Sequence, residues 1–510
     1  MAKGAYTIPI EIAEFFNKPG GRSLMVKGGA GTGKTTLALQ ILEQLAEPEK
    51  SFYLSTRVSD EALYNQFPWL RDKEMRTRIV DASKLLLESL YKPEPEDEEV
   101  PLDKESIERI STARTFLKTI TEEHLGPVIK VDRTKLTALI EQNRMPEIER
   151  IYDRIEHNLP DKSMLVIDSL EGVTHKYGLE MEELLMTLQK DLVENSNTNL
   201  LLVLEKPEAG GLEYLVDGVA TLVRTDIEKR RIRLIHIEKL RATEIRQPYY
   251  LLTLQHGRFR SFVPFEFDYS KLKPWSPKPE SNNRYSTGID DLDKLLGGGF
   301  IKGSFNVFEI GENVTSEDYF SILRPILLNF LSHNRGIMAV LPGGDAPENV
   351  RTDFTRFLPK DLFDRFVRIA DYFAMQSPVS YVMPLGKGSR EEVIRTWREN
   401  ENQLRGKDAL PIIEFTGFDA MEYIQGDTPA IRGLLHGIAK TKASNDLALG
   451  LLKPGLKVSA EIYNMADTYF KIIDIHRCPA IYGVKPKTMI YAIIPDETRG
   501  PPHVKFVPIV

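Results

Sequence analysis

The stretch GGAGTGKT at residues 28–35 decides the fold of this chain. It fits the pattern G-x-x-x-x-G-K-[ST] and follows an apolar run, SLMVKG (23–28). An amphipathic stretch, TLALQILEQL (36–45), comes directly after it. Glycines let the backbone fold around an anion with its N–H groups pointing inward, and the following helix adds its N-terminal dipole. The sequence therefore predicts a strand, a phosphate-binding loop and a helix.

The side chains of this loop predict ATP and Mg²⁺ as ligands. In such a loop Lys34 reaches the β- and γ-phosphates and the Thr35 hydroxyl binds Mg²⁺. A second Mg²⁺ contact is expected from an acid at the end of a buried strand, and MLVIDS (164–169) offers Asp168. The predicted metal ligands are Thr35 and Asp168. The predicted nucleotide-binding residues are Gly28, Gly29, Ala30, Gly31, Thr32, Gly33, Lys34, Thr35 and Thr36.

Composition narrows the class of protein. Of the 510 residues 42% are hydrophobic and 28% are charged, which is typical of globular domains. The net charge of −7 does not indicate a protein that attracts nucleic acid. The single cysteine excludes an intramolecular disulfide. The first residues lack the pattern of a signal peptide, and every apolar run is far below the roughly 20 residues that span a bilayer. We expect a cytoplasmic protein without a membrane segment.

Three pairs of segments recur in the same order in both halves of the chain, which indicates a duplicated unit. Both segments of the first pair begin with an amphipathic stretch and end in an apolar run that closes with Gly. The pairs are 6–29 with 285–311, NTNLLLVLEKP (197–207) with NDLALGLLKPG (445–455), and EYLVDGVATLVRTD (213–226) with EIYNMADTYFKIID (461–474).

Short apolar strands alternate with helices inside each copy, which predicts an α/β fold with a mostly parallel sheet covered on both faces. The first copy is longer, and apolar residues at helical spacing predict a helical insertion at about 85–160. The Pro-rich segment 267–284 has no periodicity and is predicted to be an extended linker. The expected domains are 1–266 and 285–510. The strand candidates of the first copy are 23–28, 51–56, 78–82, 164–168, 200–205 and 219–225.

The second copy lacks the phosphate-loop signature. GENVTSED (311–318) occupies that position, so Glu317 is expected in place of the lysine and Asp318 in place of the Mg²⁺-binding hydroxyl. Glu414 is expected in place of Asp168. Two carboxylates in a phosphate-binding loop would repel a triphosphate by on the order of several kcal/mol. We therefore predict that the second copy binds no ATP.

Taken together, these motifs resemble the KaiC-like branch of the RecA superfamily of P-loop ATPases. The resemblance covers nearly the whole chain as two tandem RecA-like domains. The combination of one intact and one damaged domain is similar to the archaeal GvpD type of gas-vesicle regulator. It implies ATP and Mg²⁺ as cofactors. The segments that carry it are GGAGTGKTT, RIVDAS (78–83), MLVIDS, EYLVDGV (213–219), KLR (239–241) and YSTGIDDLDKLLGGG (285–299).

The chain departs from this family at the residues that activate water. In KaiC-like proteins a pair of glutamates ends the strand after the P-loop helix, whereas here SFYLST is followed by Arg57. Asp60 and Glu61 come shortly after and could substitute, because a general base must lie within hydrogen-bond reach of the water. The alternative is that both are exposed acids in a first helical turn. Glu171 and Glu205 are weaker candidates, so ATP binding is expected with slow hydrolysis.

A Lys-x-Arg triplet in the family reaches across a subunit boundary to the neighbour's γ-phosphate, and Lys239 and Arg241 match it. An arginine that stabilises the transferring phosphoryl group accelerates hydrolysis by orders of magnitude. This role implies a homo-oligomer, such as a hexameric ring or a filament. The alternative is a pair of solvated charges at the end of an edge strand.

Three functions compete on this sequence. The first is a regulatory ATPase switch with one active and one pseudo-ATPase domain, whose second domain supplies structure or a surface for a protein partner. The second is a recombinase-like ATPase that depends on nucleic acid, which the net charge and the lack of a long basic run oppose. The third is a P-loop protein kinase, for which no serine or threonine is singled out.

Overall fold

The computed structural model describes residues 7–81, 145–207, 210–372, 374, 377, 379–386, 389–425 and 427–510. The chain divides into two compact units. Unit 1 comprises Met1–Arg224, Leu234–Tyr249 and His256–Arg260, and unit 2 comprises Thr225–Arg233, Tyr250–Gln255 and Ser261–Val510.

The first sheet has nine strands, of which the six from β3 to β6 run parallel. The strands β1 and β5 at its centre are buried along their whole length, as expected for apolar runs covered on both faces. The order across the sheet is β3 (Ile79–Asp81), β2 (Ser51–Ser55), β4 (Ser163–Asp168), β5 (Thr198–Val203), β1 (Ser23–Gly28), β6 (Gly218–Ile227), β7 (Arg230–Leu240), β8 (Tyr249–Thr253) and β9 (Arg260–Ser261).

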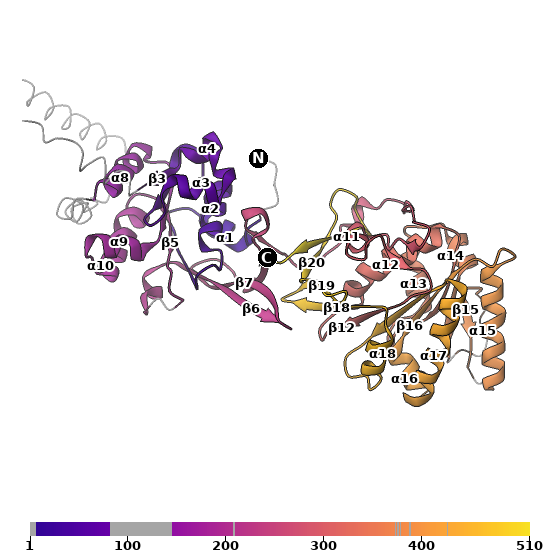
Figure 1. The fold of residues 1–510 in the computed structure, drawn as a ribbon. Helices are drawn as coiled ribbons and strands as arrows, with labels where there is room; N and C mark the ends of the chain where they lie inside the picture. Colours follow the sequence, from indigo (N-terminus) through magenta and orange to yellow (C-terminus); the bar gives the residue numbers. More distant parts are fainter. Residues whose placement is uncertain are drawn as a thin grey trace, which may run out of the picture. The chain divides into compact units, whose positions relative to one another are not determined.

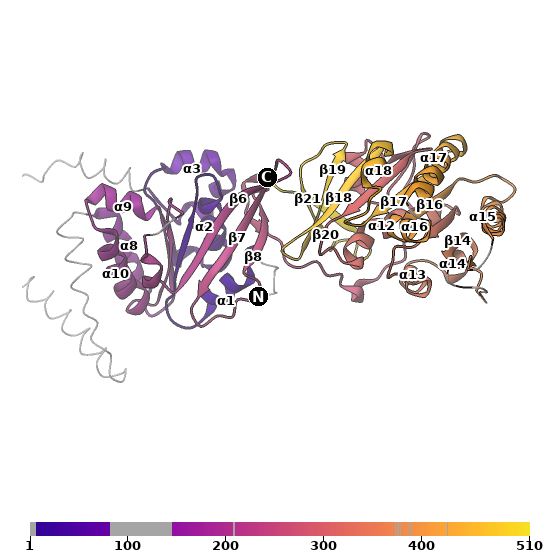
Figure 2. The ribbon, with the colours of Figure 1, turned by 90° about the horizontal axis from the view of Figure 1, so that it is seen from below.

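Helices cover this sheet. The helices α8, α9 and α10 lie together in both views (Figures 1 and 2). Their apolar side chains belong to one buried cluster with Met25, Leu165 and Leu200 of the central strands. Of the insertion predicted at about 85–160, residues 82–144 lie outside the described residues, and α8 forms part of the remainder. The helices are α1 (Ile10–Asn17), α2 (Lys34–Leu45), α3 (Asp60–Gln66), α4 (Lys73–Arg76), α8 (Pro146–Asn158), α9 (Leu170–Tyr177) and α10 (Met181–Leu188).

The second sheet repeats this topology with ten strands. The seven from β15 to β18 are parallel, and β18 to β21 continue as antiparallel strands. The order is β15 (Val382–Pro384), β14 (Val367–Asp371), β13 (Gly336–Val340), β16 (Ile412–Gly417), β17 (Leu447–Leu452), β12 (Phe305–Ile310), β18 (Thr468–Ile475), β19 (Cys478–Lys485), β20 (Tyr491–Pro495) and β21 (Val504–Pro508). A separate pair is β10 (Arg284–Tyr285) with β11 (Phe300–Ile301).

Alternation along β12 shows why helices are needed on both faces of the second sheet. Phe308 packs into a cluster with α12 and α14, whereas its neighbour Val307 packs with α16 and α18 on the opposite face. The helices are α11 (Asp290–Leu295), α12 (Ser316–Ser332), α13 (Pro347–Phe354), α14 (Lys360–Phe366), α15 (Arg390–Arg405), α16 (Phe418–Gln425), α17 (Asp427–Ser444) and α18 (Ser459–Met465).

The strand orders β3-β2-β4-β5-β1-β6 and β14-β13-β16-β17-β12-β18 are the same, so the predicted α/β fold of two mostly parallel sheets is confirmed. Among the described residues, no helix has the length and apolar content to cross a bilayer. The predicted linker 267–284 has little regular structure, yet its Trp275 is buried in the core of unit 2. We propose 1–266 and 285–510 as domains, with 267–284 as a segment that packs on the second.

Candidate functional site

The loop between β1 and α2 has the backbone of an anion-binding site. Gly28, Gly31 and Gly33 have φ of +152°, +70° and +106°. A Cβ at Gly28 would lie 2.5 Å from the backbone oxygen of Leu222, so only glycine fits there. Within the described part of the chain, no side chain caps the N-terminus of α2, which leaves the N–H groups of its first turn available to a phosphate.

Lys34 begins α2 and folds back over this loop. Its Nζ donates to the backbone oxygens of Gly28 at 2.7 Å and Gly29 at 2.9 Å. Burial lowers the pKa of Lys34 from its ordinary value, and the nearby carboxylates of Glu205, Asp168 and Glu171 oppose that effect. A buried ammonium with only carbonyl acceptors is well placed to bind the phosphates of a nucleotide instead.

The two predicted metal ligands meet in the structure. The Thr35 hydroxyl donates to Oδ2 of Asp168 at 2.6 Å, and the Tyr53 hydroxyl donates to the same oxygen at 2.6 Å. Burial and the negative charge of Asp168 raise the pKa of Tyr53 well above its ordinary value, so Tyr53 stays a donor. A carboxylate beside a hydroxyl at the carboxyl end of a parallel strand fits Mg²⁺, which prefers oxygen ligands. Nothing in the sequence pattern had marked Tyr53.

Asp60 and Glu61 lie in the first turn of α3, where Ser59 caps the helix by accepting from the N–H of Ala62 at 3.3 Å. Oδ1 of Asp60 accepts from the N–H of Glu61 at 2.8 Å, and the Glu61 side chain is exposed. The carboxylates whose charge acts on Lys34 belong to other residues. This geometry matches the alternative expectation, in which Asp60 and Glu61 are acids favoured by the helix dipole. Their role as a catalytic base stays a prediction.

Lys239 and Arg241 lie where β7 ends. Nζ of Lys239 donates to the backbone oxygens of Glu213 at 3.0 Å and Val216 at 2.7 Å, and burial lowers its pKa. Arg241 forms an ion pair of 2.9 Å with Asp217, whose side chain is almost fully buried. Lys239 is therefore held by backbone oxygens, whereas the Arg241 side chain pairs with Asp217 but stays 59% exposed.

These two cations lie toward the amino ends of the parallel strands, whereas the P-loop lies at the carboxyl ends. Asp217 also accepts from the N–H of Ser23 at 3.2 Å, and Ser23 begins the strand that Gly28 ends. Five residues of extended strand span about 16 Å. Asp217, the partner of Arg241, therefore lies about 16 Å along β1 from the P-loop of its own chain.

Comparison with known proteins agrees with this geometry. Residues 12–238 match the family described as GvpD gas vesicle protein, P-loop domain, and residues 274–416 match GvpD basic region 2. The chain is 27% identical to Protein GvpD2 of Halobacterium salinarum, and the match spans 100% of this chain and 97% of that protein. It is 25% identical to Protein GvpD1 of the same organism over 99% of this chain and 97% of the relative.

A second group of relatives covers half the chain. The chain is 28% identical to the circadian clock oscillator protein KaiC 1 of Synechocystis over 56% of this chain and 47% of KaiC 1. The chain is thus similar to GvpD proteins along its whole length and to KaiC over about half of it, which is consistent with a GvpD-like, KaiC-related P-loop ATPase. These comparisons support the coarser part of the functional prediction, a regulator built on a P-loop ATPase fold, and they imply nucleotide binding in general.

In this GvpD-like chain, the strand register shows that the predicted alignment of the second loop with the first is shifted by one residue. The strands β1 and β12 have six residues each, and Gly33 and Thr315 are the residues before α2 and α12. Ser316 therefore takes the place of Lys34, and Glu317 that of Thr35. The expectation of Glu317 at the lysine position was wrong because Gly311 follows the end of β12 and so corresponds to Gly29, whereas Gly28 is the last residue of β1.

The second loop satisfies its own backbone donors. Oδ2 of Asp318 accepts from the N–H and the hydroxyl of Thr315, both at 2.8 Å, while the Thr315 hydroxyl accepts from the N–H of Asp318 at 3.3 Å. This arrangement is a capping box. Its carboxylate lies where a phosphate would need free N–H groups.

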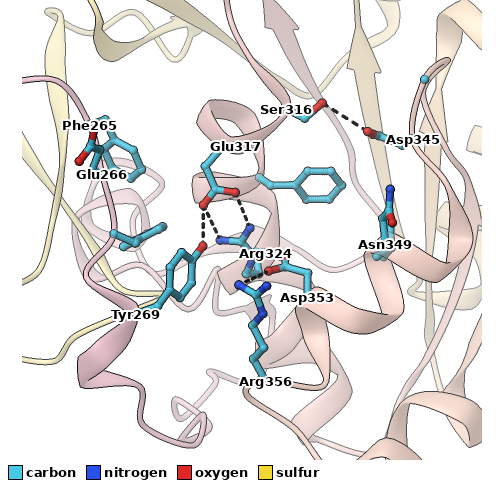
Figure 3. A pocket seen from close by; sticks show the side chains of 14 residues that line it. Phe265, Glu266, Tyr269, Ser316, Glu317, Arg324, Asp345, Asn349, Asp353 and Arg356 are labelled. Atoms are coloured by element: carbon cyan, nitrogen blue, oxygen red, sulfur yellow. Dashed lines mark hydrogen bonds and ion pairs between the residues drawn. The ribbon is translucent and has the colours of Figure 1, made fainter.

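Glu317 belongs to an ion-pair network beside that loop (Figure 3). Nη2 of Arg324 donates to Glu317 at 3.2 Å, Nε of Arg324 pairs with Asp353, and the Tyr269 hydroxyl donates to Glu317 at 2.8 Å. Burial and the hydrogen bond to Glu317 raise the pKa of Tyr269 to about 12. The network borders a cavity of about 720 Å³ at the edge of the second sheet, in unit 2.

Removal of one acid from this network is expected to destabilise unit 2. The Arg324 side chain is 1% exposed, so Asp353→Ala leaves a buried guanidinium with Glu317 as its remaining carboxylate. We expect a loss of about 2 to 3 kcal/mol in the free energy of unfolding, measured by urea denaturation. The exposed Asp361→Ala serves as the control, and equal stability of the two variants would contradict the assignment.

The predicted equivalence of Glu414 and Asp168 is also wrong. Asp168 lies level with Val203 and Val26, two residues before the end of β1, whereas Gly417 lies level with Leu451 and Phe308, two residues before the end of β12. Gly417 therefore stands in place of Asp168. Glu414 lies three residues earlier, where it forms an ion pair of 3.1 Å with Lys440, and burial raises its pKa.

Proposed function

We propose that this chain is a regulatory ATPase switch that binds Mg·ATP in its first domain and hydrolyses it slowly. The observation that carries the proposal is the P-loop with Lys34 folded over it and Thr35 bonded to Asp168 at 2.6 Å. Lys34 would bind the β- and γ-phosphates, and Thr35 and Asp168 would hold Mg²⁺, which neutralises charge on the phosphates when bound. The remaining nucleotide contacts would come from the backbone of residues 28–36.

The second domain is proposed to be a pseudo-ATPase domain without ATP. Three features support this: Ser316 replaces the lysine, Gly417 replaces the metal-binding aspartate, and the Asp318 carboxylate accepts the N–H of Thr315. Such a domain can supply structure or a surface for a protein partner. A γ-phosphate in the first domain would then bias the order of nearby segments, a common route of switching.

Homo-oligomerisation follows from the position of Lys239 and Arg241 far from their own P-loop. We propose that they complete the site of a neighbouring copy in a ring, such as a hexamer, or in a filament. The family model that matches residues 12–238 is described as GvpD gas vesicle protein, so we propose that the regulated process is of that kind and takes place in the cytoplasm.

The rate of ATP hydrolysis with and without nucleic acid tests the proposal. We expect slow, Mg²⁺-dependent turnover that single-stranded DNA changes by less than twofold. Stimulation of tenfold or more would favour the recombinase-like function instead, and transfer of label from the γ-phosphate to the chain would favour a protein kinase. Poly-glutamate at equal charge concentration controls for non-specific polyanion effects.

A further inference from the structure

One half-buried carboxylate, that of Glu171, has no part in phosphate or metal binding as described above. Glu171 lies in the first turn of α9, three residues after Asp168. Its Oε1 accepts from the N–H of Glu205 at 2.7 Å and from that of Lys206 at 3.4 Å. One oxygen of Glu171 thus fixes the chain that follows β5.

The other oxygen of Glu171 is different. Oε2 is buried and has no hydrogen-bond partner among the residues that the structure describes. A buried carboxylate oxygen without a donor is costly, and most such atoms in proteins bind a donor or a water. The negative charge of Glu171 is one of three that oppose the effect of burial on the pKa of Lys34, and Glu205 and Asp168 supply the two larger ones.

The backbone around Glu171 holds this orientation. Ser169 caps α9, and the Thr56 hydroxyl accepts from the N–H of Ser169 at 2.9 Å. A Cβ at Gly172 would lie 2.1 Å from the Thr56 hydroxyl, so the first turn of α9 packs directly against the end of β2. Glu171 is therefore fixed between the ends of β2, β4 and β5, at the edge where the P-loop lies.

Other acids at this edge are less suited to activate water. The Asp168 carboxylate already binds Thr35 and Tyr53. Glu205 forms an ion pair with Arg57, and both side chains are at least 40% exposed. A carboxylate held by an arginine is less available to accept a hydrogen bond from a water than one with an unpaired oxygen.

We propose that Glu171 is the catalytic base of the first site, an inference that rests on the proposed ATP hydrolysis. Oε2 of Glu171 accepts a proton from a water, whose oxygen forms a bond to the γ-phosphorus. The bond from the γ-phosphorus to the β,γ-bridging oxygen breaks, and ADP leaves with that electron pair. The products are ADP and inorganic phosphate, and the proton on Glu171 passes to solvent.

Glu171→Gln in the full-length chain tests the assignment. The amide oxygen of Gln can still accept both backbone N–H groups, so the fold and the affinity for a fluorescent ATP analogue should change less than threefold. Turnover at saturating Mg·ATP should fall by about 100-fold or more. Glu183→Gln, which changes an exposed acid in the first turn of α10, is the matched control and should retain turnover within about fivefold.

Each other outcome is decisive. Turnover of Glu171→Gln within fivefold of the wild type overturns the assignment, as does loss of binding in that variant, which would show a structural role alone. If the wild type binds ATP without any turnover, the base assignment fails and the binding function stands. If the wild type binds no ATP, the proposed function itself fails.

Discussion

Lys34→Ala is expected to abolish nucleotide binding by the full-length chain, with a rise of at least about 100-fold in the Kd for Mg·ATP. Two effects add. The variant loses the buried ammonium that would bind the phosphates, and it leaves Glu205, Asp168 and Glu171 without the cation on which their charges act. Those acids would then repel the triphosphate. Equilibrium titration with a fluorescent ATP analogue measures the change.

Lys27→Ala is the matched control for this variant. Lys27 is also a buried lysine, and it lies one residue before the P-loop begins, but its Nζ is bound by Glu213 at 2.9 Å and by Glu238 at 3.3 Å. We expect its loss to lower the free energy of unfolding while the Kd for Mg·ATP stays within about fivefold. Binding by Lys34→Ala as tight as that of Lys27→Ala would contradict the role given to Lys34.

Arg241→Ala is expected to lower ATP turnover by about 10³-fold with little change in the Kd for Mg·ATP, because an arginine finger acts on the transition state. Asp217 keeps its bonds to Ser23 and Gln189, so the fold should persist. Arg246→Ala is the control, since Arg246 forms an exposed ion pair with Glu14. Steady-state phosphate release measures turnover in each variant.

Mixed assemblies show whether Arg241 acts between copies. A chain with Lys34→Ala retains Arg241, and a chain with Arg241→Ala retains the P-loop, so co-assembly of the two should restore turnover above the sum of the separate variants. A mixture no more active than that sum, or an Arg241→Ala chain with turnover near that of the wild type, would rule out the role in a neighbouring site.

Much of the first unit follows from sequence because its signals are local. All six strands predicted for the first copy exist within a few residues of their predicted bounds, since buried parallel strands read as continuous apolar runs. The P-loop pattern likewise predicted the contact of Thr35 with Asp168, because the fold requires both at one edge of the sheet. A motif with fixed spacing therefore predicts where its side chains lie in the fold.

The second unit was harder to predict because its loop has lost that fixed spacing. Without the lysine there was nothing to set the register, so Glu317 and Glu414 were misplaced by one and three residues relative to the strands. Pairing between strands that are distant in sequence resolved both. Glu317 pairs with Arg324, seven residues later on α12, and Arg324 also pairs with Asp353 on α13, a contact that depends on such tertiary packing.

The most direct measurement of the central claim is the number of Mg·ATP molecules bound per chain at saturation. Isothermal titration calorimetry of the full-length wild type and of Lys34→Ala provides it. A first domain with an intact site and a second domain without one predict one ATP per wild-type chain and none for Lys34→Ala. Two ATP per wild-type chain, or one ATP retained by Lys34→Ala, would contradict the account.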